Sequence, residues 1–228
     1  MRIGVICADE ETPHGGFKIT KTTENGAVEI YKAHGFKNVG KRRFAREIRR
    51  CTKSFSELGV SVCVAEKAIS RFCTRSISVI SCGERVIRAQ AGNAALLFAS
   101  ANGICAEMLV RGGTFSEALA AAKQILKERR NVFVQNSAFD DIAETIYADT
   151  GVSIASCAEG SFLEVNLGGE GHFLEFKEKF ADFSDISVTV PKIFSEGIPE
   201  KLIPQLAETL EISGFLREKE IKIRYLPK

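Results

Sequence analysis

Basic residues concentrate in one short stretch of the chain. Between Lys32 and Lys53 there are nine Lys or Arg residues and a single acidic residue, Glu47. Nine minus one makes this stretch +8 in a chain of net charge +2, which leaves −6 for the remainder. Clustered cations can bind a phosphate or a carboxylate, and Arg offers it two parallel N–H donors. The anion contacts predicted here are Lys41, Arg42, Arg43 and Arg46.

Glycines flank the loop that precedes these cations. Gly35 and Gly40-Lys41 have the spacing Gly-x-x-x-x-Gly-Lys, between a predicted strand and a predicted helix. This loop resembles the phosphate-binding loop of P-loop NTPases, where backbone N–H groups surround the phosphates and the Lys contacts the outer ones. The resemblance covers seven residues and ends at Arg42, where that family has a Ser or Thr that holds magnesium. The resemblance implies a phosphate-binding loop, and because the magnesium-holding residue is missing, we expect this loop to bind a phosphate or carboxylate without hydrolysing it.

Two other interpretations of the basic stretch stay open. A run of charge on an amphipathic helix commonly forms a solvated face, which needs no ligand. The same cations could instead dock an acidic protein or a nucleic acid, through salt-dependent and largely nonspecific contacts. No recognised nucleic-acid motif accompanies them, and Phe44 and Phe55 belong to the apolar stripe of the predicted helix rather than to a stacking platform.

A second set of candidate residues follows the predicted strands. Strands are predicted at 2–7, 60–65, 76–80 and 131–135. Open α/β sheets bind ligands beyond the carboxyl ends of their parallel strands. The residues expected to line such a cleft are Asp9, Glu10, Ser81, Cys82, Glu84 and Asn136, with Glu66 after the second of these strands. Helix capping is the simpler role for Ser81 and for Ser137.

The sequence predicts no metal site and identifies neither a cofactor nor catalytic residues. Zinc ribbons and redox pairs need closely spaced cysteines so that two sulfurs converge, and the seven cysteines here lack that spacing. Buried, reduced thiols are expected instead. The histidines His14, His34 and His172 are scattered. No Gly-x-Gly-x-x-Gly loop follows a predicted strand, so a dinucleotide is not predicted.

Local patterns predict the elements that carry the basic stretch. Residues 17–22 and 27–32 alternate with period two on either side of Asn25-Gly26, which indicates a β-hairpin. Apolar residues then recur with helical spacing, which predicts an amphipathic helix ending at Gly59. The members of this apolar stripe are Phe44, Ile48, Cys51, Phe55 and Leu58.

The later patterns indicate the class of fold. The apolar residues of 92–110 predict one long buried helix, and 131–156 reads as strand, helix and strand with a parallel, right-handed crossover. We therefore expect an α/β fold with a mixed, mainly parallel sheet, helices on both faces and an N-terminal β-hairpin excursion. A single domain is expected over 1–228, which could divide near 112–131.

Composition and the N-terminus bear on where the protein acts. The N-terminal residues become polar too soon for a signal peptide, and the longest uncharged run, 89–106, contains polar residues and glycines. A cytoplasmic protein without a membrane span is expected.

The basic stretch predicts two alternative functions: binding of an anionic, phosphate-bearing small molecule through 35–50, or docking of an acidic protein or nucleic acid by the basic helix. The oligomeric state is not indicated.

Overall fold

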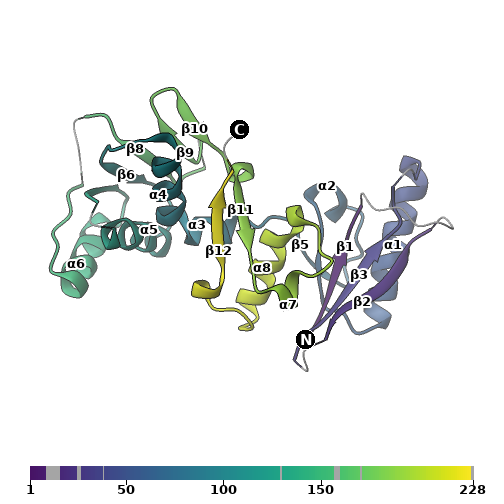
Figure 1. The fold of residues 1–228 in the computed structure, drawn as a ribbon. Helices are drawn as coiled ribbons and strands as arrows, with labels where there is room; N and C mark the ends of the chain where they lie inside the picture. The colour runs from purple at the N-terminus through teal and green to yellow at the C-terminus, as the bar shows by residue number, and fades with distance from the viewer. Residues whose placement is uncertain are drawn as a thin grey trace. The chain divides into compact units, whose positions relative to one another are not determined.

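A computed structural model describes residues 1–8, 16–24, 27–37, 39–128, 130–156, 160–169 and 171–226. The chain divides into two compact units, each built from separate stretches of sequence (Figure 1). Unit 1 consists of Met1–Gly83 with Val188–Lys222, and unit 2 of Glu84–Ser187 with Ile223–Lys228. Compact units are not necessarily domains that fold independently. The expectation of one domain that could divide near 112–131 therefore stays a prediction.

Unit 1 is built on a five-stranded sheet. Its strands, in spatial order, are β2 (Lys18–Glu24), β3 (Glu29–His34), β1 (Arg2–Ile6), β4 (Val62–Val64) and β5 (Ser78–Ile80). The β2–β3 pair is antiparallel, which confirms the predicted hairpin, although Asn25 and Gly26 lie outside the described residues. The other three pairs are parallel. Strand β3 therefore belongs both to a hairpin and to a parallel sheet.

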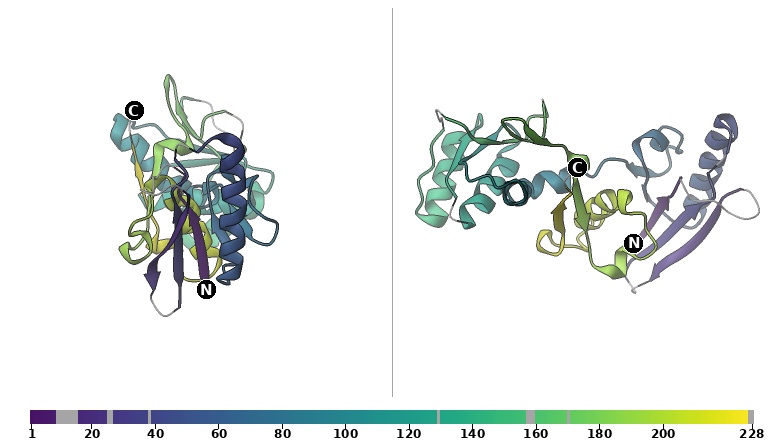
Figure 2. Two further views of the ribbon diagram at one scale, coloured as in Figure 1. Left: turned by 90° about the vertical axis from the view of Figure 1, so that its right-hand side faces the viewer. Right: turned by 45° about the horizontal axis from the view of Figure 1, so that its top comes forward.

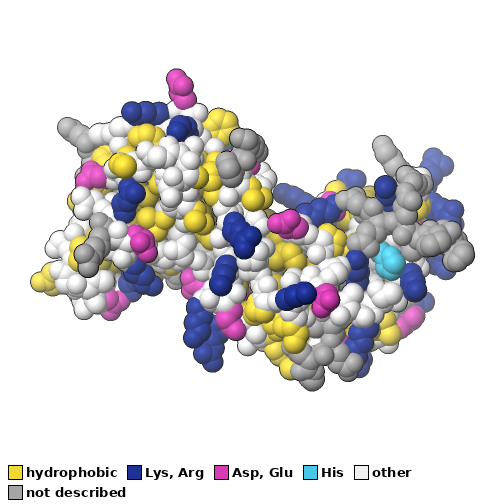
Figure 3. Space-filling model, viewed as in Figure 1, with side chains coloured by type: hydrophobic (Ala, Val, Ile, Leu, Met, Phe, Trp, Pro, Cys, Tyr) yellow, Lys and Arg dark blue, Asp and Glu magenta, His cyan; other side chains and the backbone are white. Residues whose placement is uncertain are grey.

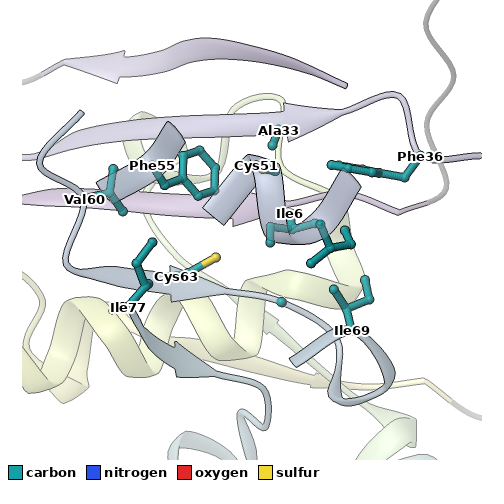
Figure 4. Packing of buried hydrophobic residues seen from close by; sticks show 11 residues of the cluster. Ile6, Ala33, Phe36, Cys51, Phe55, Val60, Cys63, Ile69 and Ile77 are labelled. Carbon is teal, nitrogen blue, oxygen red and sulfur yellow. The ribbon is translucent and has the colours of Figure 1, made fainter. Parts of the chain in front are cut away.

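Both faces of this sheet are buried at its central strand, β1. On one face Ile6 of β1 and Cys63 of β4 pack beneath Cys51 and Phe55 of α1 (Lys41–Glu57), as Figure 4 shows. The alternate residues of β1, Ile3 and Val5, are also fully buried, because successive strand residues face opposite sides. Helix α8 (Ile203–Ile212), from the C-terminal part of unit 1, packs against β4 and β5. Figure 2 shows α1 running beside β1, β2 and β3.

Short elements complete unit 1. They are α2 (Lys67–Ser70), α7 (Lys192–Ser195) and the 3₁₀ turns η2 (Glu200–Leu202) and η3 (Glu218–Glu220). Two further strands, β11 (Ile186–Thr189) and β12 (Lys222–Tyr225), form a two-stranded sheet of their own. The chain passes from one unit to the other within β11 and again within β12.

Unit 1 also holds a charge cluster around Glu29, the first residue of β3. Its carboxylate accepts hydrogen bonds from Lys21 Nζ at 2.7 Å, Arg2 Nε at 2.5 Å and the Tyr31 hydroxyl at 3.1 Å. These donors, Lys21 first and Arg2 next, lower the pKa of Glu29 from its ordinary 4.5 to about 2. Three strands are thereby cross-linked by their side chains, since Lys21 belongs to β2, Glu29 to β3 and Arg2 to β1.

This cluster should make stability depend on pH in the acid range. A carboxyl with a lowered pKa in the folded state stabilises the protein above its unfolded pKa, and loses that contribution as pH falls toward the folded pKa. The window here runs from 4.5 down to about 2. Glu29→Gln should therefore flatten the fall in unfolding free energy between pH 5 and pH 3, measured by urea titration. An unchanged slope in this variant would contradict the prediction.

Unit 2 is built on a second mixed sheet. Its strands, in spatial order, are β10 (Lys179–Ala181), β9 (Leu174–Phe176), β8 (Leu163–Asn166), β6 (Met108–Arg111) and β7 (Val132–Gln135). β8, β6 and β7 are parallel, whereas β9 and β10 return antiparallel. The helices are α3 (Glu84–Ala89), α4 (Ala91–Asn102), α5 (Phe115–Lys127) and α6 (Phe139–Thr150), and the 3₁₀ turn is η1 (Phe183–Asp185).

The predicted helix over 92–110 is wrong in its second half. Helix α4 ends at Asn102, because Gly103 takes the left-handed conformation (φ 65°) and its N–H bonds back to the last turn. Residues 108–111 are instead β6, which lies between β8 and β7 and is buried on both faces. A short apolar run has the same pattern in a buried strand as in a buried helix, so its periodicity could not distinguish them.

The strand–helix–strand prediction for 131–156 is confirmed in its parallel sense. β7 leads into α6, and the chain returns to pair Phe133 with Ala155 in parallel. The second predicted strand is reduced to this one bridge. The α/β class with parallel pairs, helices and an N-terminal hairpin is also confirmed, with the strands divided between two five-stranded sheets and the two-stranded sheet of β11 and β12.

Candidate ligand-binding site

A cavity of about 320 Å³ lies in unit 1 at the carboxyl ends of the parallel strands. Ala8 follows β1 and Glu66 follows β4, while Val39 lies on the loop that follows β3. These three strands are parallel neighbours, so their carboxyl ends share one edge of the sheet. This edge is where α/β sheets bind ligands. The lining consists of Ala8, Val39, Phe44, Glu66, Ala68, Ile69, Arg71 and Phe72.

Aromatic packing positions the loop between β3 and α1. Gly35 has a φ of 102°, a left-handed conformation that turns the chain sharply after β3. Phe36 then enters the core, where it stacks on Phe17 with ring centroids 5.9 Å apart. Phe44 contacts Phe36 edge-on at 6.1 Å and contacts Phe72 edge-on at the same distance. This chain of rings joins the loop, the first turns of α1 and the segment after α2 into one wall of the cavity.

The cavity is mainly apolar, with one charge of each sign. Six of its eight lining residues are apolar, and the exceptions are Glu66 and Arg71. The Arg71 guanidinium is exposed and lies over the Phe72 ring, 4.7 Å from its centroid. The Glu66 carboxylate forms an ion pair with Lys201, with Nζ and Oε1 2.7 Å apart. Arg71 is therefore the lining cation without a carboxylate partner among the described residues.

The four predicted anion contacts all lie on α1, next to this cavity in sequence. Lys41 is the first residue of the helix, between the lining residues Val39 and Phe44, and its side chain is not among those described. Arg42, Arg43 and Arg46 are exposed and do not line the cavity. The first turn of α1 contains no acidic residue, and its N-cap, Gly40, offers no side-chain hydrogen bond.

The glycine-flanked loop occupies the position that the P-loop resemblance implied. It joins β3, a strand parallel to β1, to the N-terminus of a long helix. Asn38 lies outside the described residues, and the inward side chain of Phe36 takes up one of the loop positions. Phosphate binding by this loop stays a prediction.

The predicted strand-end residues are divided between the two sheets. Asp9 and Glu10 lie outside the described residues. Ser81 and Cys82 follow β5 in unit 1, whereas Glu84 begins α3 in unit 2. Asn136 follows β7, a strand of the other sheet. Ser81 and Asn136 therefore follow strands of different sheets, and a cleft that includes Asp9 and Glu10 stays a prediction.

Asn136 has a structural role where it stands. Its side-chain N–H groups donate to the carbonyls of Gly112 and Gly113 at 2.8 and 3.0 Å, and its Oδ1 accepts from Ala138 N at 2.9 Å. The last contact is an Asx turn that leads into α6. The capping role expected of Ser137 is therefore wrong, since the asparagine before it supplies the hydrogen bond.

Sequence patterns had placed Glu66 at a strand end but did not point to Arg71 or Phe72. Both follow α2, a helix of four residues with no periodicity strong enough to predict. Phe44 was assigned to the buried stripe of α1, and its position at the N-terminal end of that stripe also exposes it to the cavity. The position of this segment between the predicted strands 60–65 and 76–80 was the one available signal.

A second cavity, of about 540 Å³, belongs to unit 2. It is lined by residues 102–105, between α4 and β6, and by 176–179, the turn between β9 and β10. Although this cavity is larger, it lies at the amino end of β6, whereas α/β sheets bind ligands at the carboxyl ends of their strands. Lys179 also donates to the Asn102 carbonyl at 3.0 Å, across this space. We favour the unit 1 cavity because it has the strand-end position and aromatic walls typical of ligand sites.

The cysteines of unit 1 have the character of core residues. Burial raises the pKa of the Cys51 and Cys63 thiols, and raises that of Cys73 to about 11. Since the thiolate is the nucleophile and the metal ligand, these protonated thiols are suited to neither role. Within the described part of the chain, no three His, Cys, Asp or Glu side chains are grouped to hold a metal ion.

His172 belongs to unit 2. Its Nδ1 is 3.0 Å from Asp182 Oδ1, and its ring stacks on Phe180 at 3.9 Å. His34 is the last residue of β3, and His14 lies outside the described residues.

Comparisons with protein-family models, with curated proteins and with solved structures gave no match. None of the helices in the described ranges has the length and apolar character needed to cross a membrane. What can be said of function therefore depends on the geometry of this chain.

Proposed function

We propose that unit 1 binds a small anionic molecule, bearing a phosphate or carboxylate, in the cavity at the carboxyl ends of β1 and β4. The observation that carries this proposal is the position of the cavity. It opens at the edge of a parallel sheet, beside the start of α1, with Phe44 and Phe72 as its walls. Ligand sites of α/β folds combine this position with a largely apolar lining and a few polar groups that orient the ligand.

The charges around the cavity favour an anion. Arg71 lines it, and Lys41 begins α1 between two of the lining residues. Glu66, the lining carboxylate, is already paired with Lys201, so its charge is largely compensated. The Arg71 guanidinium lies over the Phe72 ring, and a guanidinium can bind a phosphate or carboxylate through two parallel hydrogen bonds.

The size of the cavity limits the ligand. Small-molecule sites occupy roughly 300–1,000 Å³, and the volume here is about 320 Å³. A mononucleotide or a sugar phosphate is a better fit than a dinucleotide. The two aromatic walls favour a ligand with a planar or apolar part, such as a nucleobase. The described lining holds no second acid–base group besides Glu66, so we propose binding and assign no reaction.

A thermal-shift screen tests this proposal. AMP and glucose 6-phosphate should be compared with adenosine and glucose, at low and high salt, by differential scanning fluorimetry. A phosphate compound present at about 100 times its Kd would stabilise the protein by about 2.7 kcal/mol. Arg71→Gln should weaken its binding at least tenfold, because one charge-assisted contact is lost.

Two further variants separate the cavity from general charge effects. Ala68→Trp, at an exposed position of α2 that lines the cavity, should fill the space and abolish binding with the fold intact. Arg75→Gln removes an exposed cation four residues from Arg71 and should leave the affinity unchanged. If Ala68→Trp still binds the compound as the wild type does, the ligand lies elsewhere and the proposal is wrong.

We also propose that the protein acts in the cytoplasm. The support for this location is a pair of core thiols: Cys51 and Cys63 are buried, free cysteines. Proteins with many reduced cysteines are typical of reducing compartments.

A further inference from the structure

The cations of α1 lie on one side of the helix. At 100° per residue, the positions 42, 43, 46, 49, 50 and 53 fall within an arc of about 120°, on the side opposite Ile48, Cys51 and Phe55. We call these residues the basic face: Arg42, Arg43, Arg46, Arg49, Arg50 and Lys53. From the first to the last they extend about 16 Å along the helix axis. This arrangement makes a straight row of positive charge rather than a pocket.

All six side chains of the basic face are exposed. Arg50 forms an ion pair with Glu47, at 3.2 Å, and the other five have no ion pair with any described residue. Glu57 is the one acidic residue on the same arc, and it comes after the last cation. Figure 3 shows dark blue side chains projecting at the end of the view where Figure 1 places α1. The protein's described carboxylates therefore leave most of this charge uncompensated.

The charge is arranged against the stability of the helix itself. Cations at a helix N-terminus oppose the macrodipole, and here the first turn contains Lys41, Arg42 and Arg43 with no acidic residue. The last turn contains no basic residue. An external anion would explain why cations are placed where they do not stabilise the helix. This argument from charge placement does not depend on the cavity.

The composition of the basic face indicates which polyanion it fits. Protein interfaces have a core of aromatic and aliphatic side chains. Between Arg42 and Lys53 the exposed residues of α1 are all cations, with no apolar anchor. Five of the six are Arg, which binds phosphate through two N–H donors. Phosphates repeated along a rigid strand match a row of Arg better than an acidic protein does.

We propose that the basic face docks on the phosphate backbone of duplex nucleic acid, independently of base sequence. A single strand is disfavoured because its binding relies on exposed aromatic rings for stacking. The aromatic residues of α1, Phe44 and Phe55, instead belong to the cavity wall and to the core. A duplex carries one phosphate charge for about every 1.7 Å of its axis, so about 16 Å of helix meets more phosphates than it has cations.

Salt dependence of binding measures this contact directly. A labelled 20-base-pair duplex DNA should be titrated with the full chain by fluorescence anisotropy between 30 and 200 mM salt. Each neutralised phosphate contributes about −0.9 to the slope of log K against log salt, so five free cations predict a slope near −4.5. The triple variant Arg42→Gln, Arg46→Gln and Arg49→Gln should shift the slope toward zero by about 2.7 and weaken binding at least tenfold at 50 mM salt.

A matched variant removes the same charge from elsewhere. Arg75→Gln, Arg85→Gln and Lys219→Gln are exposed and off the basic face, and this triple should change the slope by less than about 1. Equal effects of the two triples would overturn the proposal, because net charge alone would then explain binding. Absence of measurable binding at 30 mM salt would overturn it too.

Binding of other polyanions tests the alternatives to a duplex. The duplex should be bound more tightly than a 20-nucleotide single strand or poly-glutamate, and a scrambled duplex should bind equally well. Tighter binding of poly-glutamate would assign the face to an acidic protein, and tighter binding of the single strand would reject a duplex. Ala68→Trp, which fills the cavity, should leave duplex binding unchanged, so this proposal and the proposed ligand site can fail separately. Circular dichroism melts should show that both triples are folded.

Discussion

Replacing Gly4 by Ala should lower the unfolding free energy by about 2 kcal/mol, a typical cost of overpacking a core. A Cβ at this position would lie 2.6 Å from Cε2 and 2.7 Å from Cδ2 of Phe55. Neither partner can move away easily. Gly4 is in β1, the strand between β3 and β4, and Phe55 of α1 is fully buried against this sheet. Alanine is preferred to glycine inside a strand by roughly 0.5–1 kcal/mol, which offsets only part of this cost.

A double-mutant cycle identifies the cause. Phe55→Leu removes the part of the ring that meets the new methyl group, at a cost of about 1–2 kcal/mol in the wild-type background. In the Gly4→Ala background it should cost at least 1 kcal/mol less, because it also relieves the clash. Urea unfolding monitored by circular dichroism gives all four free energies. If the changes in unfolding free energy of the two single variants add up to that of the double variant, a clash with Phe55 is not the reason why Gly4→Ala destabilises the protein.

Gly92→Ala should destabilise unit 2 by about 2–3 kcal/mol, although alanine favours a helix by about 1 kcal/mol over glycine. Here the added Cβ would lie 2.4 Å from the backbone oxygen of Ala121 and 2.7 Å from Cβ of Gln124. Both atoms belong to α5, which packs closely against α4 at this point. Backbone atoms of a helix cannot rotate away as the end of a side chain can.

Separating these two helices would also break buried hydrogen bonds. Gln124, which is buried, accepts from Asn93 N at 3.1 Å and donates to the Ala89 carbonyl at 2.7 Å. Loss of such partners costs about 1–3 kcal/mol for each polar group left unsatisfied. Ser100→Ala, at an exposed position of the same helix, is the control and should change the stability by less than about 0.5 kcal/mol. If Gly92→Ala lowers the unfolding free energy no more than Ser100→Ala does, the packing of α4 on α5 does not exclude a side chain at position 92, and the prediction is wrong.

Some features of the fold were predictable from short stretches of sequence. The antiparallel hairpin follows from two alternating segments around Asn25-Gly26, and the basic helix follows from a helical apolar stripe and a glycine stop. The capping box of α5, in which Thr114 Oγ1 accepts from Glu117 N and the Glu117 carboxylate accepts from Thr114 N, is another signal of this kind. Each depends on residues within a few turns of one another.

Other features could not be predicted in this way. Residues 108–111 have the composition of a buried helix, and they form a strand because β8 and β7 are available on either side. Gly4 and Gly92 carry no local signal at all, since their importance comes from side chains and backbone that pack against them from other elements. The same holds for the cavity, whose lining comes from three loops after three different strands.

The α/β class, the N-terminal hairpin and the basic face of α1 can be read from the amino-acid sequence alone, because periodicity and turn residues act over distances of a few residues. The three-dimensional arrangement alone shows that most strands divide between two five-stranded sheets, that Ser81 and Asn136 follow strands of different sheets, and that Glu66 pairs with Lys201. Strand order and side-chain contacts across 135 positions of sequence, from 66 to 201, depend on which surfaces bury one another in three dimensions.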